Sequence, residues 1–581
     1  MLFKHSKIPV LITLAVLSCL TFAHGVIANP QADLAPAPPM GWNSFDSYGV
    51  YLHEEAALAN VEAMAEKLKP HGYEYYVVDN GWFGEYKLQT GTIFPAEKHA
   101  HDININEFGY FLPSKVYFPN GLKPIADRCH ELGLKFGVHL MRGIPRKAYE
   151  LNLPIQETAY TARDVAITDP KLNCKWCQYC YGVDMTHPGG QAWYDGLIQH
   201  VAELGVDFIK YDDIVPYPAE VEAVAKAIRK CGRPIVLSLS PGGNVDPNAI
   251  DSFRLANMLR VTKDVWDEQH YIDECFKAWR KWQGRECHGF WIDMDMIPFG
   301  QLQLMSPRNG NEDPMSKGDI ALAGKGVNRW CQLSDAQKQT FITLRALAAS
   351  PLMMGGDLPS LDTYSLALIT NRQILACNQN GVMGKCLFER EGVEVWQVLK
   401  KGRTDTGWVG VFNRSEAVQG LTVTPEILGL NHGQAVRVQD VWNDRCFLLS
   451  EAQSQLVQIE AHDVLFLCFQ PVPLAKRPNI VYILADDLGY GDLGHYGQQQ
   501  IQTPHLDRLA EGGIRFTQHY AGSTVCAPSR CVLMTGRHVG HVQVRDNREV
   551  KFMGQWPMEA DTQTVAHVMK AAGYRTALIG K

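Results

Sequence analysis

The stretch LGVDFIKYDD, residues 204–213, contains the unit that decides the fold. Apolar residues at helical spacing lead into it over 197–204, and Gly205 ends that helix. Residues 207–211 then predict a short strand, and the acidic Asp212 follows where this strand ends. A helix that leads through a glycine into a strand is the repeating unit of α/β folds.

The same unit recurs along residues 36–380. Strands are predicted at 75–78, 135–140 and 234–239, each after a helical stretch and a glycine. Alternating strands and helices form a parallel sheet, and this many units favour closure into a (β/α)8 TIM barrel over an open sheet. Because barrel chemistry sits at the carboxyl ends of strands, polar residues at these ends are candidate site residues. They are Asp79, His139, Asp212, Ser240, Asp264 and Asp295.

Further regions follow the barrel, as expected for a chain of 581 residues. Short apolar alternations without helical spacing predict an antiparallel β-sandwich over 381–470. The proline-containing stretch 471–477 is the predicted linker. The third segment, 478–581, opens with the apolar run 480–484, which is typical of a buried strand.

The N-terminus has the pattern of an export signal. Lys4 and Lys7 lead into the apolar run 8–22, and small residues follow, so residues 1–28 are the predicted signal peptide. The run is too short to span a membrane. A lipoprotein attached at Cys19 is the alternative. The protein is therefore expected to be secreted or periplasmic, where disulfides can form.

Charge excludes some classes of partner. The chain has 55 basic and 62 acidic residues, a net charge of −7 spread over its length. This balance predicts no nucleic-acid partner and no membrane-surface partner, and no membrane span is expected in the mature chain. The sequence leaves the oligomeric state open.

Two of the predicted strand ends carry the carboxyl groups that glycoside hydrolysis needs. A retaining enzyme places two such groups roughly 5 Å apart, on either side of the scissile bond. Asp212 closes the predicted fourth strand and Asp264 the sixth. Lys210 points to the same side of its strand as Asp212 and can keep that carboxylate ionised. The alternative is a structural ion pair at the barrel rim, but six polar strand ends together favour catalysis.

Six short motifs, most of them at strand ends, belong together. They are GWNSF at 41–45, Asp79, KYD at 210–212, RVTKD at 260–264, DMDM at 293–296 and SPLMMGGDL at 350–358. With them, residues 38–470 resemble glycoside hydrolase family 27, the α-galactosidase family. The resemblance implies hydrolysis of terminal α-galactosyl groups on an oligo- or polysaccharide without a cofactor, with Asp212 as nucleophile and Asp264 as acid/base. It also implies a terminal-sugar pocket lined by Trp42, Asp79, Lys210, Arg260 and Asp295.

Three positions depart from the family pattern. Asn80 stands where the family has a second aspartate, and His139 stands where it has a tyrosine. Ser240-Pro241-Gly242 replaces Cys-Glu-Trp. Because these positions contact sugar hydroxyls, a sulfated or otherwise modified galactan is an expected substrate. Arg142 could bind a sulfate or carboxylate on it in a bidentate manner, or it could be a structural arginine.

Three cysteines, Cys174, Cys177 and Cys180, form a C-x2-C-x2-C pattern between the predicted third and fourth strands. A zinc or iron–sulfur site would need a fourth ligand nearby and a reducing compartment, and neither is evident. Disulfides are therefore the favoured interpretation. The histidines show no metal-binding spacing.

The third segment carries motifs of its own. They are Asp486-Asp487 after the apolar run, TPHLD at 503–507, and the run CAPSRCVLMTGR at 526–537. This segment resembles the start of a formylglycine-dependent sulfatase. The resemblance implies calcium bound by Asp486 and Asp487, formylglycine made from Cys526, and supporting roles for Arg530 and Lys581.

The sequence as given stops at Lys581, where sulfatases continue with further ligands. We therefore expect calcium, formylglycine and sulfatase activity only if the missing C-terminus exists, and we expect a frameshift, premature stop or clipped gene model otherwise. Three functions remain open: a retaining glycosidase, a sulfatase acting on sulfated carbohydrate, and a non-catalytic sugar-binding relic. The intact pair Asp212 and Asp264 favours the first.

Overall fold

The computed structural model describes residues 31–174, 179–241, 244–307, 324–430, 435–472, 478–552 and 554–580. The chain forms two compact units, residues 1–473 and residues 474–581. The predicted signal peptide with Cys19, as well as Cys177, Gly242 and Lys581, lies outside the described residues.

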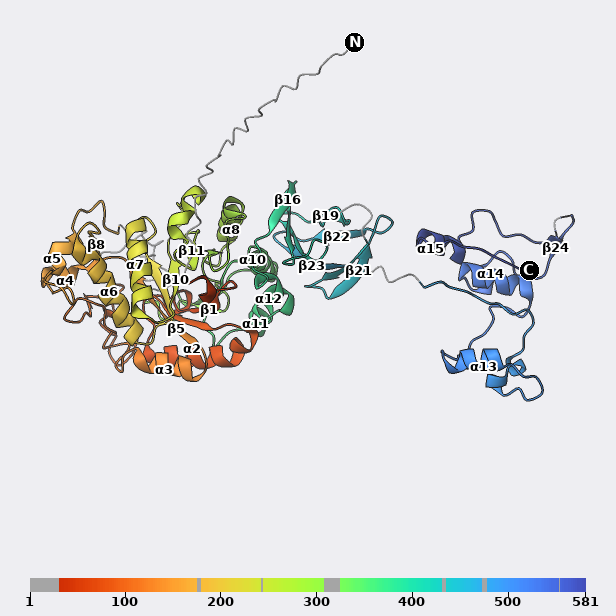
Figure 1. The fold of residues 1–581 in the computed structure, drawn as a ribbon, viewed down its shortest axis with the longest axis horizontal. Coiled ribbons are helices and arrows are strands. Elements are labelled where there is room, and N and C mark those ends of the chain that lie inside the picture. Colours follow the sequence, from red (N-terminus) through yellow and green to blue (C-terminus); the bar gives the residue numbers. More distant parts are fainter. Residues whose placement is uncertain are drawn as a thin grey trace, which may run out of the picture. The chain divides into compact units, whose positions relative to one another are not determined.

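Eight parallel strands form the main sheet of the first unit, and they are neighbours in chain order (Figure 1). A parallel bridge between Ile297 and Met354 joins the two ends of the sheet, so the sheet closes on itself. This arrangement confirms the predicted TIM barrel. The strands are β1 (Met40–Asn43), β2 (Tyr75–Val78), β5 (Lys135–Met141), β9 (Phe208–Asp212), β10 (Val236–Leu239), β11 (Met258–Arg260), β12 (Trp291–Asp293) and β15 (Leu352–Met354).

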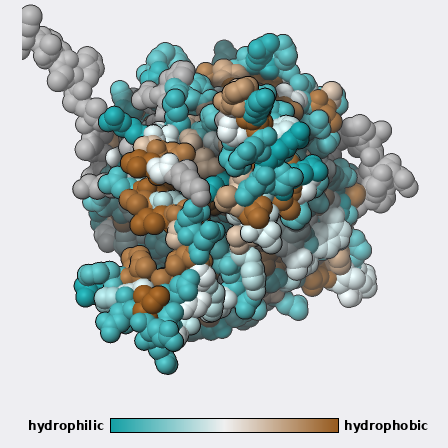
Figure 2. Space-filling view, turned by 90° about the vertical axis from the view of Figure 1, so that its right-hand side faces the viewer, coloured by the Kyte–Doolittle hydropathy of each residue, from teal (hydrophilic) through white to brown (hydrophobic). Residues whose placement is uncertain are grey.

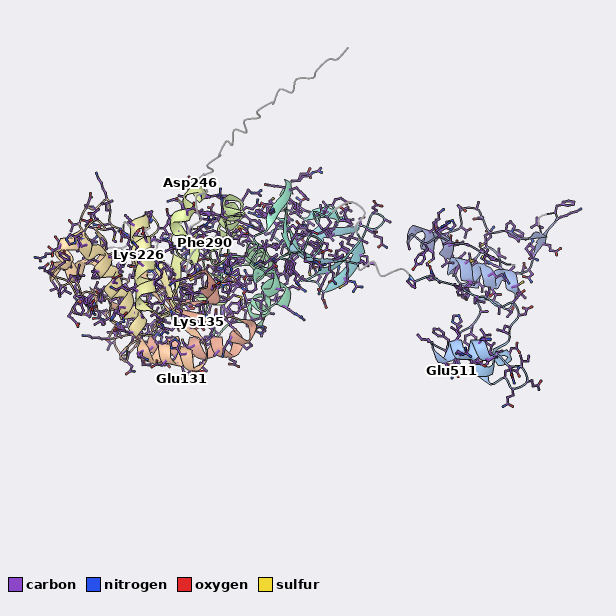
Figure 3. The ribbon with its side chains drawn as sticks, in the orientation of Figure 1. Glu131, Lys135, Lys226, Asp246, Phe290 and Glu511 are labelled. Atoms are coloured by element: carbon purple, nitrogen blue, oxygen red, sulfur yellow. The ribbon has the colours of Figure 1, made fainter. Side chains whose placement is uncertain are left out.

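Helices connect these strands and bury one face each. In the helix before β2, Val61 and Met64 are buried at the predicted spacing. Glu131 ends one helix and Lys135 begins β5 (Figure 3), and Gly133 between them adopts a φ of 69°, a conformation that other residues avoid. The helices are α2 (Glu54–Lys67), α3 (Lys123–Glu131), α6 (Pro188–Glu203), α7 (Pro218–Cys231), α8 (Gln269–Trp282), α10 (Asp335–Leu347), α11 (Thr363–Ile369) and α12 (Arg372–Asn378).

Short elements occupy the loops of the barrel. The first of them, α1, directly follows β1 and brings Phe45 and Asp46 to the carboxyl end of the sheet. These elements are α1 (Phe45–Tyr48), β3 (Gly84–Glu85), β4 (Asp102–Ile103), β6 (Ile144–Pro145), α4 (Arg146–Glu150), α5 (Ala162–Val165), β7 (Ala166–Ile167), β8 (Cys180–Val183), β13 (Gln301–Leu302) and β14 (Arg329–Trp330).

An antiparallel sheet of six strands follows the barrel in the order β16-β17-β18-β23-β20-β21, beside a two-stranded sheet, β19-β22. Alternate residues of β20, such as Val436 and Val438, are buried in a second core with Phe469 of β23. The predicted β-sandwich is confirmed. The strands are β16 (Lys385–Arg390), β17 (Val393–Leu399), β18 (Gly407–Asn413), β19 (Gln419–Val423), β20 (Val436–Asp440), β21 (Arg445–Leu449), β22 (Gln455–Ile459) and β23 (Val464–Pro471).

The second unit has little regular structure. Its apolar run 480–484 forms no strand in the described structure, and the five side chains are 48–81% exposed. The buried strand predicted here is therefore absent, because no described strand pairs with the run. A small apolar cluster forms around Cys531, Val542 and Val544. The elements are α13 (Pro504–Glu511), α14 (Cys526–Thr535), β24 (Glu549–Val550), β25 (Gly554–Gln555) and α15 (Val565–Ala571).

Surface and cysteine chemistry complete the description. Apolar side chains lie in separate patches among hydrophilic ones on the face drawn in Figure 2. Within the described residues no helix is long and apolar enough to cross a membrane. No disulfide joins any two described cysteines, and Cys177, the middle cysteine of the predicted disulfide cluster, lies outside the described residues, so disulfides in that cluster stay a prediction. Cys174 and Cys180, for example, are buried, and buried thiols pack like small apolar side chains.

Candidate active site

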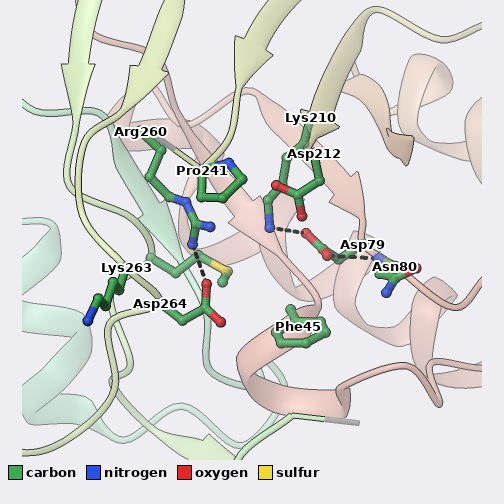
Figure 4. A pocket seen from close by; sticks show the side chains of 10 residues that line it. Phe45, Asp79, Asn80, Lys210, Asp212, Pro241, Arg260, Lys263 and Asp264 are labelled. Carbon is green, nitrogen blue, oxygen red and sulfur yellow. Dashed lines mark hydrogen bonds and ion pairs between the residues drawn. The ribbon is translucent and has the colours of Figure 1, made fainter. Parts of the chain in front are cut away.

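A cavity of about 260 Å³ opens at the carboxyl ends of the barrel strands (Figure 4). It brings together residues from five barrel strands or the loops that follow them, as well as one residue of α1. Both expected catalytic carboxylates are among them. The lining residues are Phe45, Asp79, Asn80, Lys210, Asp212, Pro241, Arg260, Lys263, Asp264 and Met296.

Asp212, the expected nucleophile, is the last residue of β9 and is buried. Its Oδ2 lies 2.9 Å from Nε2 of His139, while its Oδ1 has no hydrogen-bond partner among the described residues. Burial alone would raise the pKa of Asp212. The ammonium of Lys210, the contact with His139 and the guanidinium of Arg260 outweigh burial and hold this pKa well below its usual value. The carboxylate is therefore ionised at every physiological pH.

Asp79 and Lys210 line the same cavity and contact each other. Lys210 donates a hydrogen bond of 2.8 Å to Oδ2 of Asp79, and Asn43 donates one of 2.5 Å to the same oxygen. Burial raises the pKa of Asp79, but the ammonium of Lys210, the nearby His139 and the hydrogen bond from Lys210 together outweigh burial, so the net shift is downward. The neighbouring Asn80 lines the cavity, and its buried Oδ1 has no hydrogen-bond partner among the described residues.

Asp264, the expected acid/base, lies four residues beyond the end of β11 and not at the end itself. Arg260 Nη1 donates to its Oδ1 at 2.6 Å and lies 3.2 Å from Oδ1 of Asp295. The side chain of Asp264 is 39% exposed, whereas that of Asp295 is 3% exposed. Asp264 therefore lies where it can exchange a proton with water.

Three expected sugar-binding residues, His139, Ser240 and Asp295, lie just outside the cavity lining. His139 contacts Asp212 and is fully buried. Ser240 and Asp295 line a second cavity of about 20 Å³ inside the barrel, enough for one water molecule. His139 therefore supports Asp212, and Asp295, 3.2 Å from Arg260, supports that arginine.

Trp42 was expected in the pocket, but the structure places it elsewhere. Its ring is fully buried, stacks on Tyr76 at 4.8 Å between ring centroids, and donates its N–H to the carbonyl of Gly356 at 2.8 Å. Phe45 takes the aromatic position in the lining instead. Strand β1 ends at Asn43, so Trp42 points into the barrel wall while Phe45, in α1, reaches the cavity.

Arg142 does not line the cavity either. Its side chain is 2% exposed and contacts Asp213 at 3.2 Å, Glu220 at 2.8 Å and the carbonyl of Leu172 at 2.6 Å. Its guanidinium also stacks on the ring of Tyr217 at 3.5 Å. These contacts leave no face for a sulfate on the substrate, so the structural alternative for Arg142 holds.

Four lining residues were not predicted as site residues. Each of them lies within or next to a motif named from the sequence, so their position beside these motifs is the signal that could have identified them. Sequence spacing gives the strand ends but not the path of the loops that follow them. The four residues are Phe45, Pro241, Lys263 and Met296.

The sulfatase-like residues lie in the second unit. Cys526 begins α14 and contacts the side chain of Asn547, and Arg530 pairs with Asp486 at 3.1 Å. No group of three or more His, Cys, Asp or Glu side chains in the described residues is placed to hold a metal ion. Asp486 and Asp487 alone fall short of the six to eight oxygens that calcium takes, so the present residues do not fit the expected ion.

Known proteins resemble both units. The family model of the alpha galactosidase C-terminal beta sandwich domain matches residues 391–469, that of the glycosyl hydrolases family 31 TIM-barrel domain matches 42–231, and the sulfatase model matches 478–581. Human steryl-sulfatase is 47% identical over 111 residues, and the chain spans about a fifth of its length.

Relatives of the first unit cover the barrel and the sandwich together. Alpha-galactosidase 2 of Arabidopsis thaliana is 25% identical over 437 residues, which is 74% of this chain and 88% of that one. A solved family 27 β-L-arabinopyranosidase from Geobacillus stearothermophilus is 34% identical with a TM-score of 0.67, and the match covers 76% of this chain and 99% of that one. A putative α-N-acetylgalactosaminidase from Bacillus halodurans is 33% identical with a TM-score of 0.63, over 75% of this chain and 97% of that one. The chain therefore belongs to glycoside hydrolase family 27, and a sulfatase-like segment follows its glycosidase part.

Proposed function

We propose that the barrel hydrolyses terminal α-galactosidic bonds with retention of configuration, using Asp212 as nucleophile and Asp264 as acid/base. The observation that carries this proposal is that the two carboxyl groups line one cavity in opposite environments. Asp212 is buried and held ionised, whereas Asp264 is partly exposed. A retaining glycosidase needs this division of roles between its two carboxyl groups.

The first step is attack by Asp212 on the anomeric carbon. The ionised carboxylate of Asp212 supplies the attacking lone pair, and His139 holds its Oδ2 at 2.9 Å. The covalent glycosyl–enzyme forms as the bond to the leaving group breaks. Arg260 and Lys210 stabilise the charge of the carboxylate before attack.

Asp264 gives its proton to the departing oxygen in this step. In the second step it takes a proton from water, which attacks the anomeric carbon and releases Asp212. The exposure of Asp264 gives the water access, and the bond from Arg260 fixes its orientation. Asp79, Lys210 and Asn80 hold the hydroxyls of the terminal sugar.

The relatives suggest which sugars to test. An α-D-galactopyranoside and a β-L-arabinopyranoside share the ring stereochemistry and differ only in the exocyclic hydroxymethyl group. Asn80, an uncharged residue in the lining, is compatible with either sugar. The test is a panel of aryl α-galactoside, β-L-arabinopyranoside and α-N-acetylgalactosaminide. We expect the α-galactoside to be hydrolysed by the wild type and not by Asp212→Asn, and no turnover of it would refute the proposal.

A sulfated galactan is the second candidate substrate. Lys210 and Arg260 are already paired with carboxylates, whereas Lys263 lines the cavity and forms no ion pair with another described residue. If a sulfate is recognised, Lys263→Ala should lower kcat/KM for a sulfated galactoside while leaving the unsulfated one unchanged. Equal kcat/KM for both substrates in both proteins would remove this candidate.

The N-terminal segment and the second unit lie outside the glycosidase part of the chain. We propose that residues 1–28 direct the chain out of the cytoplasm, which cleavage mapping of the mature N-terminus would test. For the second unit we derive no reaction step, because its described residues do not fit the calcium that sulfatases of this kind use. Calcium and formylglycine at Cys526 belong to it only together with further ligands.

A further inference from the structure

A buried network of charges lies beside Asp212 but outside the cavity. Its centre is Arg142, which binds Asp213 through Nε at 3.2 Å and Glu220 through Nη1 at 2.8 Å. Tyr217 stacks on the guanidinium, and Tyr194 donates to Glu220. Neither Arg142 nor Asp213 lines the cavity, so neither can contact the sugar there.

Asp213 has an unusual backbone. Its φ is 61°, in the left-handed region that residues with a side chain rarely enter. Such a conformation persists only where surrounding contacts impose it. The bond from Arg142 to the Asp213 carboxylate is one contact that can do so, beside a hydrogen bond to this carboxylate from Cys174. The strained residue directly follows the expected nucleophile.

Strand β5 and the residue that follows it, Arg142, hold the end of β9 at three points. His139 contacts the carboxylate of Asp212 at 2.9 Å. The backbone N–H of Arg142 donates to the carbonyl of Asp212 at 3.0 Å, and its side chain holds Asp213. His139 of β5 and Arg142, the residue directly after β5, therefore fix the carboxylate, the backbone and the following turn of Asp212.

We propose that Arg142 and Asp213 form a positioning pair that fixes the direction of the chain at Asp212, the last residue of β9, and so orients the Asp212 side chain. This inference rests on the proposed role of Asp212 as nucleophile. Attack on the anomeric carbon needs an aligned oxygen, and a displacement of about 1 Å lowers the rate by about 10²-fold.

The test is a series at Asp213, with kcat, KM and the melting temperature measured for each variant on one aryl glycoside. Asp213→Asn keeps an acceptor and tolerates the positive φ, so we expect a loss of kcat of only a few fold. Asp213→Gly keeps the backbone conformation without the anchor, and we expect about a 10-fold loss. Asp213→Ala keeps neither, and we expect about a 10²-fold loss with KM unchanged.

The matched control is Asp444, an exposed aspartate of the sandwich with a φ of 49°. Asp444→Ala introduces similar backbone strain away from the cavity and should lower the melting temperature without changing kcat. If Asp213→Ala also changes only the melting temperature, the positioning pair is refuted. Asp212→Asn, run in parallel, separates the two ideas: turnover retained there would refute the proposed function itself, whereas its loss with a fully active Asp213→Ala would refute only this inference.

Discussion

The barrel and segment 478–580 both carry the motif of an enzyme, yet their motif residues lie in different surroundings. In the barrel, Asp79 and Lys210 are 131 positions apart in sequence and 2.8 Å apart in space, above a large buried core. In the second unit, the apolar run before Asp486 is exposed, and the buried cluster centres on three residues. The same kind of sequence signal therefore corresponds to a built site in one region and to an open surface in the other.

Burial explains why this difference matters for chemistry. In a water-poor cavity, charges such as Lys210 act strongly on Asp212 and lower its pKa, whereas water screens exposed pairs such as Arg530 and Asp486. A motif indicates ancestry, but a reaction needs the packed surroundings that position and tune its residues. This contrast between the two units can be tested by experiment.

The largest expected effect is the loss of the nucleophile. Asp212→Asn should lower kcat on an aryl glycoside by about 10³-fold or more, because no carboxylate remains to attack. The matched change in the other unit, Cys526→Ser, should leave glycosidase activity at the wild-type level. Comparable losses in both variants would mean that the second unit contributes to the barrel's chemistry.

Removal of the acid/base should give a smaller and selective effect. Asp264→Ala should slow substrates with poor leaving groups by about 10²- to 10⁴-fold, since these need a proton delivered to the departing oxygen. Activated aryl glycosides should lose far less in the first step. Equal losses across a series of leaving groups would assign the acid to another residue.

A buried carboxyl group should give the barrel a pH-dependent stability. Burial raises the pKa of Asp293 to about 6, and the nearby Asp295 adds to the shift. Neutral Asp293 makes its full contribution to the free energy of unfolding below about pH 4. This contribution is lost as the pH rises to about 6, because the buried carboxyl group then ionises. Asp293→Asn cannot ionise, so it should gain up to about 3 kcal/mol of unfolding free energy relative to wild type between pH 4 and 7. Chemical denaturation of both proteins at pH 4 and at pH 7 measures this. The same difference in unfolding free energy between the two proteins at both pH values would contradict it.

The smallest expected effect on activity comes from removing the second unit. Limited proteolysis should cut between residues 471 and 478 or within the exposed apolar run, and leave a fragment that ends close to Gln470. That fragment should retain glycosidase activity within about twofold, since the residues that line the cavity all belong to the first unit, between Phe45 and Met296. A protease-resistant second unit that releases sulfate from an aryl sulfate would overturn the contrast.

Much of the first unit could be predicted from sequence. The helical and strand periods predicted four of the barrel strands, the parallel barrel and the sandwich. The polar strand ends led to Asp79, Asp212 and Asp264, the spacing on the fourth strand led to Lys210, and the family resemblance added Arg260, all of which line one cavity. Periodicity reports which face of an element is buried, so it serves well where strands position the site.

The remaining features depend on contacts between distant segments. Trp42 and Phe45 belong to one motif, and only the turn from β1 into α1 decides which ring reaches the cavity. Arg142 could have served a substrate or a network, and Glu220, 78 positions away, decides for the network. The buried strand predicted at 480–484 failed for the same reason, because a strand is buried only by neighbours that its own sequence does not encode.

The most direct test of the central claim is the configuration of the first product. Proton NMR during early hydrolysis of an aryl α-galactoside by the full-length protein distinguishes the two anomers before they interconvert. If Asp212 attacks one face of the anomeric carbon, and Asp264 then activates a water on the opposite face, which the leaving group has left, α-galactose must appear first. β-Galactose as the first product would contradict the account, because it would require direct attack by water and leave Asp212 without the role proposed for it.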